Sequence, residues 1–178
     1  MILFINGSFG VGKTTVAEML VRHVSNSLLF DAEEVGFFLR NIVRPIESFD
    51  DFQDLPMWRT LTISTALLLK KTYGRTLIMP MTIWHRPYFD EVMSGLRQFE
   101  PHLYHFCLTA SAETIRQRLE NRPDSQQAYN WISERIERCV SAFQSPAFAM
   151  QIASDDKTPE QIVAEIMRSA PLEPVDAL

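Results

Sequence analysis

The stretch GSFGVGKTT, from Gly7 to Thr15, decides the fold of this chain. Residues Gly7–Thr14 fit the pattern G-x-x-x-x-G-K-[ST], in which a glycine-rich loop surrounds phosphate groups. Glycine permits positive φ and a close approach of the backbone, so successive N–H groups can point into one concavity. A short apolar run, Ile2–Ile5, precedes the loop, and apolar residues at helical spacing follow it. The sequence therefore predicts a strand, a phosphate-binding loop and a helix.

This loop has defined chemical roles for its residues. The Lys13 ammonium would reach the β- and γ-phosphates of ATP, and the Thr14 hydroxyl would ligate Mg²⁺. The helix that follows would direct its N-terminus toward the anion. The residues expected to bind the cofactor are Gly7, Ser8, Phe9, Gly10, Val11, Gly12, Lys13, Thr14 and Thr15.

Composition fits one nucleotide-binding domain over residues 1–170 with a short tail at 171–178. The 17 basic and 22 acidic side chains give a net charge of −5, which argues against nucleic acid as a partner. Cys107 and Cys139 lack metal-type spacing; we expect packed thiols, with a disulfide as the alternative. No signal peptide or membrane-spanning stretch is recognisable, so a cytoplasmic location is expected. The oligomeric state stays open.

Apolar runs alternate with helical patterns along the chain. The expected strands are 2–6, 28–31, 76–81, 103–108 and 149–153. Such alternation predicts an α/β fold, a three-layer sandwich in which helices cover both faces of a parallel sheet. The last helix is expected to begin at Thr158, with Gln161 completing a capping box. Ligands of these sheets bind beyond the carboxyl ends of the strands, which is where functional residues are expected.

The acid at one strand end, Asp31, has two interpretations. It is a candidate general base or metal organiser, and it is also a good helix N-cap because Glu34 follows three residues later. The third strand ends at Met79-Pro80-Met81-Thr82 without the acid through which many phosphate-loop enzymes hold Mg²⁺. Asp31, Asp50 or Asp51 would therefore have to take that role.

Several arginines surround a polar, glycine-free segment at 121–130. They are Arg116, Arg118, Arg122, Arg135 and Arg138. Arginines that close over phosphates stabilise charge and exclude water, so we expect a small lid at about 120–138. In this interpretation Arg116 and Arg122 are catalytic and Arg118 binds the cofactor. The alternative is a solvated helix face with ordinary surface arginines.

The layout resembles the nucleoside-monophosphate-kinase-like phosphate-loop proteins, and more closely the ATP-binding tunicamycin-resistance protein family. The segments that carry the resemblance are INGSFGVGKT, VGFFLR, DDFQDLPMWR, PMTIWHRPYF, HFCLTAS, RCVSAFQSPAF and EQIVAEI. They run from about Ile5 to Ile166. The resemblance implies a five-stranded sheet of order 2-3-1-4-5 with a lid, bound ATP and Mg²⁺, and protection of a bacterium from tunicamycin, a lipid-tailed nucleoside sugar.

The resemblance also suggests where the drug would lie. Arg40, within GFFLR, would bind an anionic or hydroxyl-rich part of it. Asp50, Asp51 and Gln53 would hydrogen-bond sugar hydroxyls, or the two acids would only solvate a turn. His85 is expected to form hydrogen bonds rather than to ligate a metal. Among the aromatics available to a base or acyl tail, Phe37, Phe38, Trp58, Trp84, Tyr88 and Phe89, the better ligand contacts are Trp84 and Tyr88, whereas Phe38 and Phe89 are expected in the core.

Three functions remain open at this stage. The first is a kinase that phosphorylates a hydroxyl of tunicamycin or a related nucleoside sugar, an ATP-dependent phosphotransferase. The second is ATP-dependent binding that sequesters the drug without turnover. The third is a small-metabolite kinase of the nucleotide or shikimate type. Some members of the resembled family carry an amphipathic C-terminal membrane segment, but SAPLEPVDAL is short and proline-broken, so no stable membrane anchor is expected.

Overall fold

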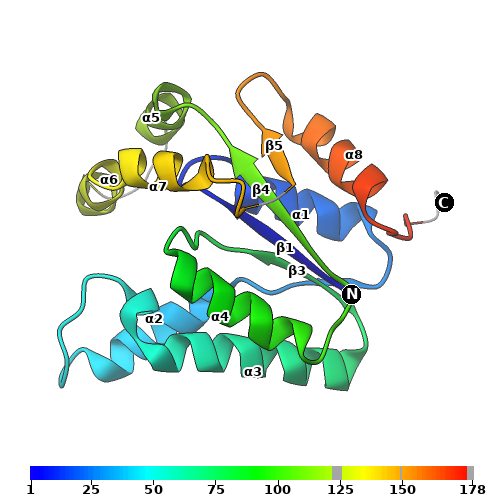
Figure 1. The fold of residues 1–178 in the computed structure, drawn as a ribbon, viewed down its shortest axis with the longest axis horizontal. Coiled ribbons are helices and arrows are strands. Elements are labelled where there is room, and N and C mark those ends of the chain that lie inside the picture. Colours follow the sequence, from blue (N-terminus) through cyan, green and yellow to red (C-terminus); the bar gives the residue numbers. More distant parts are fainter. Residues whose placement is uncertain (122–125, 149, 176–178) are drawn as a thin grey trace.

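The computed structural model describes residues 1–121, 126–148 and 150–175. Its centre is a five-stranded sheet of order β2-β3-β1-β4-β5, in which neighbouring strands pair in parallel (Figure 1). The strands are β1 Ile2–Gly7, β2 Ser27–Leu29, β3 Thr76–Pro80, β4 Leu103–Thr109 and β5 Gln151–Ala153. This topology confirms the order predicted from the sequence, and β2 and β5 are shorter than expected.

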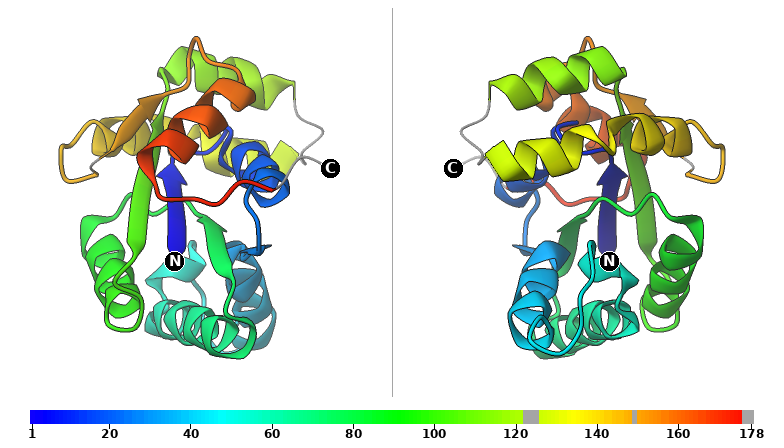
Figure 2. Two further views of the ribbon diagram at one scale, coloured as in Figure 1. Left: turned by 90° about the vertical axis from the view of Figure 1, so that its right-hand side faces the viewer. Right: turned by 90° about the vertical axis from the view of Figure 1, so that its left-hand side faces the viewer.

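Helices cover both faces of the sheet (Figures 1 and 2). The helices are α1 Lys13–His23, α2 Ala32–Val43, η1 Phe52–Asp54 (a 3₁₀ turn), α3 Pro56–Tyr73, α4 Arg86–Arg97, α5 Ala112–Glu120, α6 Gln126–Ser133, α7 Ile136–Phe143 and α8 Pro159–Ser169. The α8 helix begins with the predicted capping box, in which Thr158 and Gln161 exchange hydrogen bonds. Within the described residues, no helix has both the length and the apolar character needed to cross a membrane.

The central strand β1 is buried on both sides, as expected of a parallel strand under two helical layers. Successive side chains of a strand point to opposite faces. Ile2 and Phe4 therefore pack in the cluster that contains residues of α2, α3 and α4. Leu3 and Ile5 pack in the cluster formed with α1 and α8. A continuous apolar run thus places the phosphate loop at the end of the most deeply buried strand.

The loop after β1 needs glycine at defined positions. Gly7, Gly10 and Gly12 have φ values of 144°, 72° and 104°, which L-residues with a side chain rarely adopt. At Gly7 a Cβ atom would also lie 2.4 Å from the carbonyl oxygen of Leu108. The chain can therefore turn tightly into α1, which begins at Lys13.

A second glycine brings α2 close to η1. A Cβ atom on Gly36 would lie 2.5 Å from the ring of Phe52, so only a hydrogen fits between them. Phe52 in turn packs against Trp58, with ring centroids 5.5 Å apart. This contact fixes the segment that contains Asp51 and Gln53 against α2.

Three expectations about side chains need correction or completion. Phe38 was expected in the core but is 59 % exposed, because the buried side of α2 is formed by Gly36, Leu39 and Val43. Trp58 is completely buried and its indole N–H donates to the carbonyl of Ala32, so it is not open to a ligand. Phe89 is in the core, as predicted.

Two further expectations concern the cysteines and the polar segment at 121–130. Cys107 and Cys139 are free, buried thiols, which supports the packing interpretation over a disulfide. Burial raises the pKa of each thiol to about 12. The helix α6, Gln126–Ser133, begins inside the polar, glycine-free segment at 121–130 around which the lid was expected.

Candidate functional site

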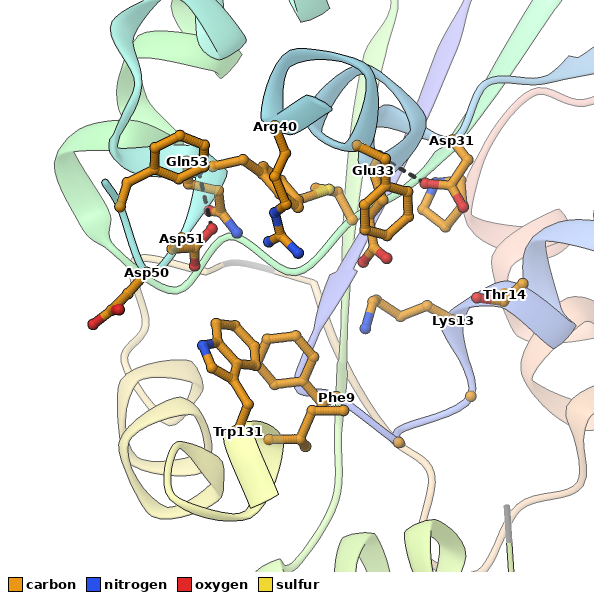
Figure 3. A pocket seen from close by; sticks show the side chains of 18 of the residues that line it. Phe9, Lys13, Thr14, Asp31, Glu33, Arg40, Asp50, Asp51, Gln53 and Trp131 are labelled. Atoms are coloured by element: carbon orange, nitrogen blue, oxygen red, sulfur yellow. Dashed lines mark hydrogen bonds between the residues drawn. The ribbon is translucent and has the colours of Figure 1, made fainter. Parts of the chain in front are cut away.

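A pocket of about 700 Å³ opens at the carboxyl ends of the central strands (Figure 3). It is lined by Phe9, Gly10, Gly12, Lys13, Thr14, Asp31, Glu33, Phe37, Arg40, Arg44, Phe49, Asp50, Asp51, Phe52, Gln53, Pro80, Met81, Trp131 and Ile132. The lining therefore joins the phosphate loop to α2, η1 and α6. Residues predicted for the cofactor and residues predicted for the acceptor meet in one space.

The lysine of the phosphate loop is held in place without a ligand. Its Nζ atom donates to the carbonyl of Ser8 at 2.8 Å, and the side chain is buried. Thr14 is in the first turn of α1 and lines the same pocket. The loop is therefore shaped to receive a phosphate group at the N-terminus of α1, where backbone N–H groups have no partner within the helix.

Asp31 forms the predicted N-cap of α2. Its Oδ1 atom accepts from the backbone N–H of Glu33 at 2.9 Å. Burial raises the pKa of this carboxyl above its usual value, although the Glu33 N–H and the Lys13 charge act in the opposite direction. The carboxylate also lines the pocket, so capping does not remove it from the site.

Glu33 is a pocket acid that the sequence interpretation missed. It lies on α2 one turn before Phe37 and two turns before Arg40, and all three line the pocket. Residues separated by three or four positions share a helix face, so the spacing of Glu33 from Arg40 was the available signal. Figure 3 shows the Glu33 carboxylate directed toward the space between Lys13 and Arg40.

One wall of the pocket, called the acceptor wall below, is formed around η1 by the predicted acceptor residues Asp50, Asp51 and Gln53. Hydrogen bonds fix its shape. Asp51 accepts from the backbone N–H of Gln53 at 3.0 Å, and Gln53 Nε2 donates to the carbonyl of Thr82 at 2.9 Å. Burial raises the pKa of Asp51. Asp50 is exposed at the pocket edge. Asp51 therefore shapes its turn and faces the pocket as well, so the two interpretations of this acid are compatible.

A buried arginine supports this wall from behind. Arg59 on α3 donates to the Gln53 carbonyl at 2.6 Å and to the Glu91 carboxylate at 2.5 Å. Its guanidinium lies 4.3 Å from the ring centroid of Tyr88. The sequence interpretation did not include Arg59, since nothing in the helical pattern of α3 distinguishes it from a surface arginine.

Two arginines, Arg40 and Arg44, and several aromatic side chains complete the lining of the pocket. The guanidinium carbon of Arg40 lies 5.8 Å from the Phe37 ring centroid and 5.5 Å from that of Phe52. Phe9, in the phosphate loop, meets Trp131 of α6 edge to face, with centroids 5.4 Å apart. Neither Phe9 nor Trp131 was predicted to contact an acceptor.

Three predicted acceptor residues lie outside the described pocket lining. Trp84 packs at the margin of the core, and His85 and Tyr88 pack against each other with ring centroids 4.2 Å apart. The Tyr88 hydroxyl donates to Asp54 at 3.1 Å. These residues therefore surround the acceptor wall, and the structure does not bring them into the cavity.

The arginines predicted for the lid are divided among different contacts. Arg116 is exposed and forms an ion pair with Glu137 of α7. Arg118 donates to the carbonyl of Val11 at 3.2 Å and to the carbonyl of Ser154 at 2.6 Å, which ties the phosphate loop to the segment after β5. Arg122 and part of the predicted lid lie outside the described residues.

The pocket offers oxygen ligands of the kind Mg²⁺ prefers. The Thr14 hydroxyl and the Asp31 carboxylate lie on the same side of Lys13 (Figure 3). Within the described part of the chain, no group of three or more His, Cys, Asp or Glu side chains could hold a metal alone. Mg²⁺ in nucleotide sites is commonly held by one or two protein oxygens together with phosphates and water, and this donor set fits that pattern.

Solved structures share this fold over nearly their whole length. The tunicamycin resistance protein of Deinococcus radiodurans has a TM-score of 0.81 and 24 % identity, covering 99 % of both chains. A sugar kinase from Janibacter sp. HTCC2649 has a TM-score of 0.66 and 19 % identity, covering 94 % of this chain and 92 % of its own. A gluconokinase from Sinorhizobium meliloti 1021 has a TM-score of 0.64 and 14 % identity, covering 93 % of this chain and 89 % of its own.

These likenesses establish the fold. No curated protein matches the chain in sequence. A sequence family described as "AAA domain" does match, over residues 3–138, which include the phosphate loop, the acceptor wall and α6. That range covers well over half of the 178 residues. The chain therefore belongs to the AAA domain family.

Proposed function

We propose that this protein is an ATP-dependent phosphotransferase that modifies a hydroxyl of tunicamycin or a related nucleoside sugar. The observation that carries the proposal is the single pocket in which Lys13 of the phosphate loop and the wall of Asp51 and Gln53 face the same space. Phosphoryl transfer requires the acceptor hydroxyl in line with the γ-phosphate, and such a pocket can hold both. The drug is proposed because a tunicamycin resistance protein has the same fold along its whole length.

The phosphate loop takes the nucleotide in this proposal. Backbone N–H groups from Gly7 to Thr14 bind the phosphates of ATP, and Lys13 exchanges its contact with Ser8 for one with the β- and γ-phosphates. The Thr14 hydroxyl would hold Mg²⁺, which neutralises charge on the phosphates when it is bound. Arg118 keeps the loop in register through Val11.

Asp31 is the proposed general base. Its carboxylate lies in the pocket near Lys13, and burial raises its pKa toward the range useful for accepting a proton. Glu33 is the competing candidate, since it lines the same pocket two residues further along the chain. Arg116, with Arg122, is proposed to approach the phosphates from the lid during turnover, where it would stabilise the developing charge.

The acceptor is proposed to bind against α2 and η1. Arg40, Asp50, Asp51 and Gln53 supply donors and acceptors for hydroxyl groups along this wall. Sugar kinase and gluconokinase structures share the fold, and both names denote transfer to a small hydroxylated molecule. Binding of the drug without turnover is the second candidate, since a resistance protein can act by sequestration alone.

Mass spectrometry of the drug tests the proposal. Incubation of the protein with ATP, Mg²⁺ and tunicamycin is expected to add the mass of one phosphoryl group and to release an equal amount of ADP. Lys13→Ala should abolish the product, whereas Lys71→Ala, which removes an exposed lysine of α3, should not. ATP-dependent binding of unmodified tunicamycin with no mass gain would favour sequestration, and no binding of the drug at all would reject both.

A further inference from the structure

We infer that Phe9 and Trp131 form a stacking platform for an uncharged sugar ring of the acceptor, a role that rests on the proposed function. The two rings come from segments far apart in the chain, the phosphate loop and α6. They meet edge to face, with an interplanar angle of 80° and centroids 5.4 Å apart. Both line the 700 Å³ pocket, so at least part of each ring faces the cavity.

The platform lies opposite the polar wall. In Figure 3 the rings of Phe9 and Trp131 face Arg40, Asp51 and Gln53 across the pocket, with Lys13 to one side. A ligand in this space therefore contacts an aromatic surface on one side and hydrogen-bonding groups on the other. A sugar ring has this division, since its C–H bonds form apolar faces and its hydroxyls project from the edge.

The indole is held in position by a cation. The guanidinium carbon of Arg135 lies 4.1 Å from the centroid of the Trp131 ring, and Nη1 of Arg135 donates to the Trp131 carbonyl at 3.0 Å. Such a cation–π contact fixes the ring that it touches. A ring fixed before binding loses little entropy when a ligand stacks on it.

The charges of the pocket favour a neutral acceptor. The ionisable side chains of the lining are the three cations Lys13, Arg40 and Arg44 and the four acids Asp31, Glu33, Asp50 and Asp51. Once Lys13 binds the nucleotide phosphates, the acids outnumber the remaining cations by two to one. An anionic acceptor such as a nucleoside monophosphate would meet net repulsion there.

The acceptor wall distinguishes a sugar from a nucleobase. Carboxylates such as Asp51 accept hydrogen bonds and cannot donate when ionised. A sugar ring offers several O–H donors to them, whereas a uracil base offers one N–H donor between two carbonyl oxygens that the carboxylates repel. The pairing of an aromatic platform with carboxylate acceptors therefore points to the sugar portion of a nucleoside sugar, with the base elsewhere.

Calorimetric titration of two variants tests the platform. Trp131→Leu should weaken tunicamycin binding about fivefold or more, since stacking on an aromatic ring is worth at least about 1 kcal/mol. Trp131→Phe should restore most of the affinity, and ATP binding should be unchanged in both variants. A thermal melt of each variant confirms that it is folded. Unaltered drug binding in Trp131→Leu, or a parallel loss of ATP binding, would overturn the inference.

Fluorescence with two simple probes identifies the ring. N-acetylglucosamine, a neutral pyranose, should change the emission of the wild type and leave Trp131→Phe unaffected. Uridine should produce no Trp131-dependent change; if uridine does and the pyranose does not, the platform binds the base and the sugar assignment is wrong. A pyranose response in a protein that fails to phosphorylate tunicamycin would support the platform while rejecting the proposed kinase activity.

Discussion

The carboxylate of Asp31 accepts a hydrogen bond from the backbone N–H of Glu33 at 2.9 Å, and both side chains line the same pocket. One short segment thus begins α2 and supplies two acids to the site. The cap satisfies a backbone N–H group of α2 and is local to that helix. The two carboxylates reach the pocket because the segment that carries them follows the carboxyl end of β2. Mutations at these two positions can therefore separate stability from chemistry.

We expect Asp31→Asn to lose most turnover while ATP affinity stays near the wild-type value. Asparagine is as good an N-cap as aspartate, so the helix should keep its stability, but the amide cannot accept a proton as a base. Asp31→Ala should lose the cap too, at about 1 kcal/mol of the free energy of unfolding. Steady-state kinetics and thermal melts measure the two effects. Full activity in Asp31→Asn would leave the residue as a cap, and Glu33→Gln would then be the variant expected to fail.

The proposed base also predicts a pH profile. Because burial raises the pKa of Asp31, activity should fall on the acid side at a pH above the ordinary aspartate value of 3.8. The loss occurs as the pH decreases, since protonation removes the base. The dependence of kcat on pH measures this limb in the wild type and in Glu33→Gln. If the acid limb of kcat disappears in Glu33→Gln and is unchanged in Asp31→Asn, the general base is Glu33 and not Asp31.

The acceptor wall should bind the drug and leave the nucleotide unaffected. We expect Arg40→Ala and the pair Asp51→Ala with Gln53→Ala to weaken tunicamycin binding with ATP affinity near wild type, because these side chains lie away from the phosphate loop. Asp51→Asn, which retains the turn, should show a smaller loss. Separate calorimetric titrations of each ligand decide the matter. If these variants lose ATP affinity and keep tunicamycin affinity, the acceptor does not bind against α2 and η1.

Replacement of Arg59 should destabilise the protein strongly. Arg59→Met leaves the Gln53 carbonyl without its donor and the wall without support, a change that typically costs about 1–3 kcal/mol per unsatisfied group. Urea denaturation measures the loss. Arg97→Met, in which the arginine is in the last turn of α4 and exposed, is the control and should change stability little. Equal effects of the two would show that Arg59 does not support the wall.

A histidine outside the site should make stability depend on pH. Burial among Phe4, Phe89 and Phe148 lowers the pKa of His105 from 6.5 to about 4, aided by the charge of Arg97. The folded state therefore favours the neutral ring, and its contribution is complete above pH 6.5 and is lost as the pH falls toward 4. The loss amounts to at most roughly 3–4 kcal/mol, at about 1.4 kcal/mol per pKa unit.

His105→Phe checks this assignment. The phenyl ring suits the aromatic cluster and cannot titrate, so stability between pH 6.5 and 4 should decline less than in the wild type. Denaturant titrations at several pH values give the comparison. Parallel curves for the two proteins would mean that other groups cause the acid sensitivity.

The sequence predicted the parts of the structure that depend on local chemistry. The glycines of the phosphate loop, the Asp31 cap and the Thr158 capping box each require particular residues at particular spacings, and all are found. None of these three features depends on contacts between distant segments. The sheet order does depend on such contacts, and it was implied by the family resemblance rather than by the alternation of strands and helices.

The parts that could not be predicted depend on contacts between distant segments. Phe38 fits the apolar spacing of α2, yet that helix also lines a pocket and faces solvent, so spacing alone did not identify the buried side. The contact between Trp131 and Phe9 is a tertiary contact, because α6 and the phosphate loop are far apart in the sequence. Arg59 was missed for the same reason, since its hydrogen bond to the Gln53 carbonyl forms only in the folded tertiary structure.

The contact between Gly36 and Phe52 restricts how this pocket can change during evolution. Because a Cβ atom at position 36 would lie 2.5 Å from the aromatic ring, a larger residue there requires a smaller one at position 52 or an outward shift of η1. Asp51 and Gln53 flank that ring and would move with it. Paired replacement of positions 36 and 52 is therefore a route by which related proteins could acquire wider pockets and accept bulkier molecules, with the phosphate loop left intact.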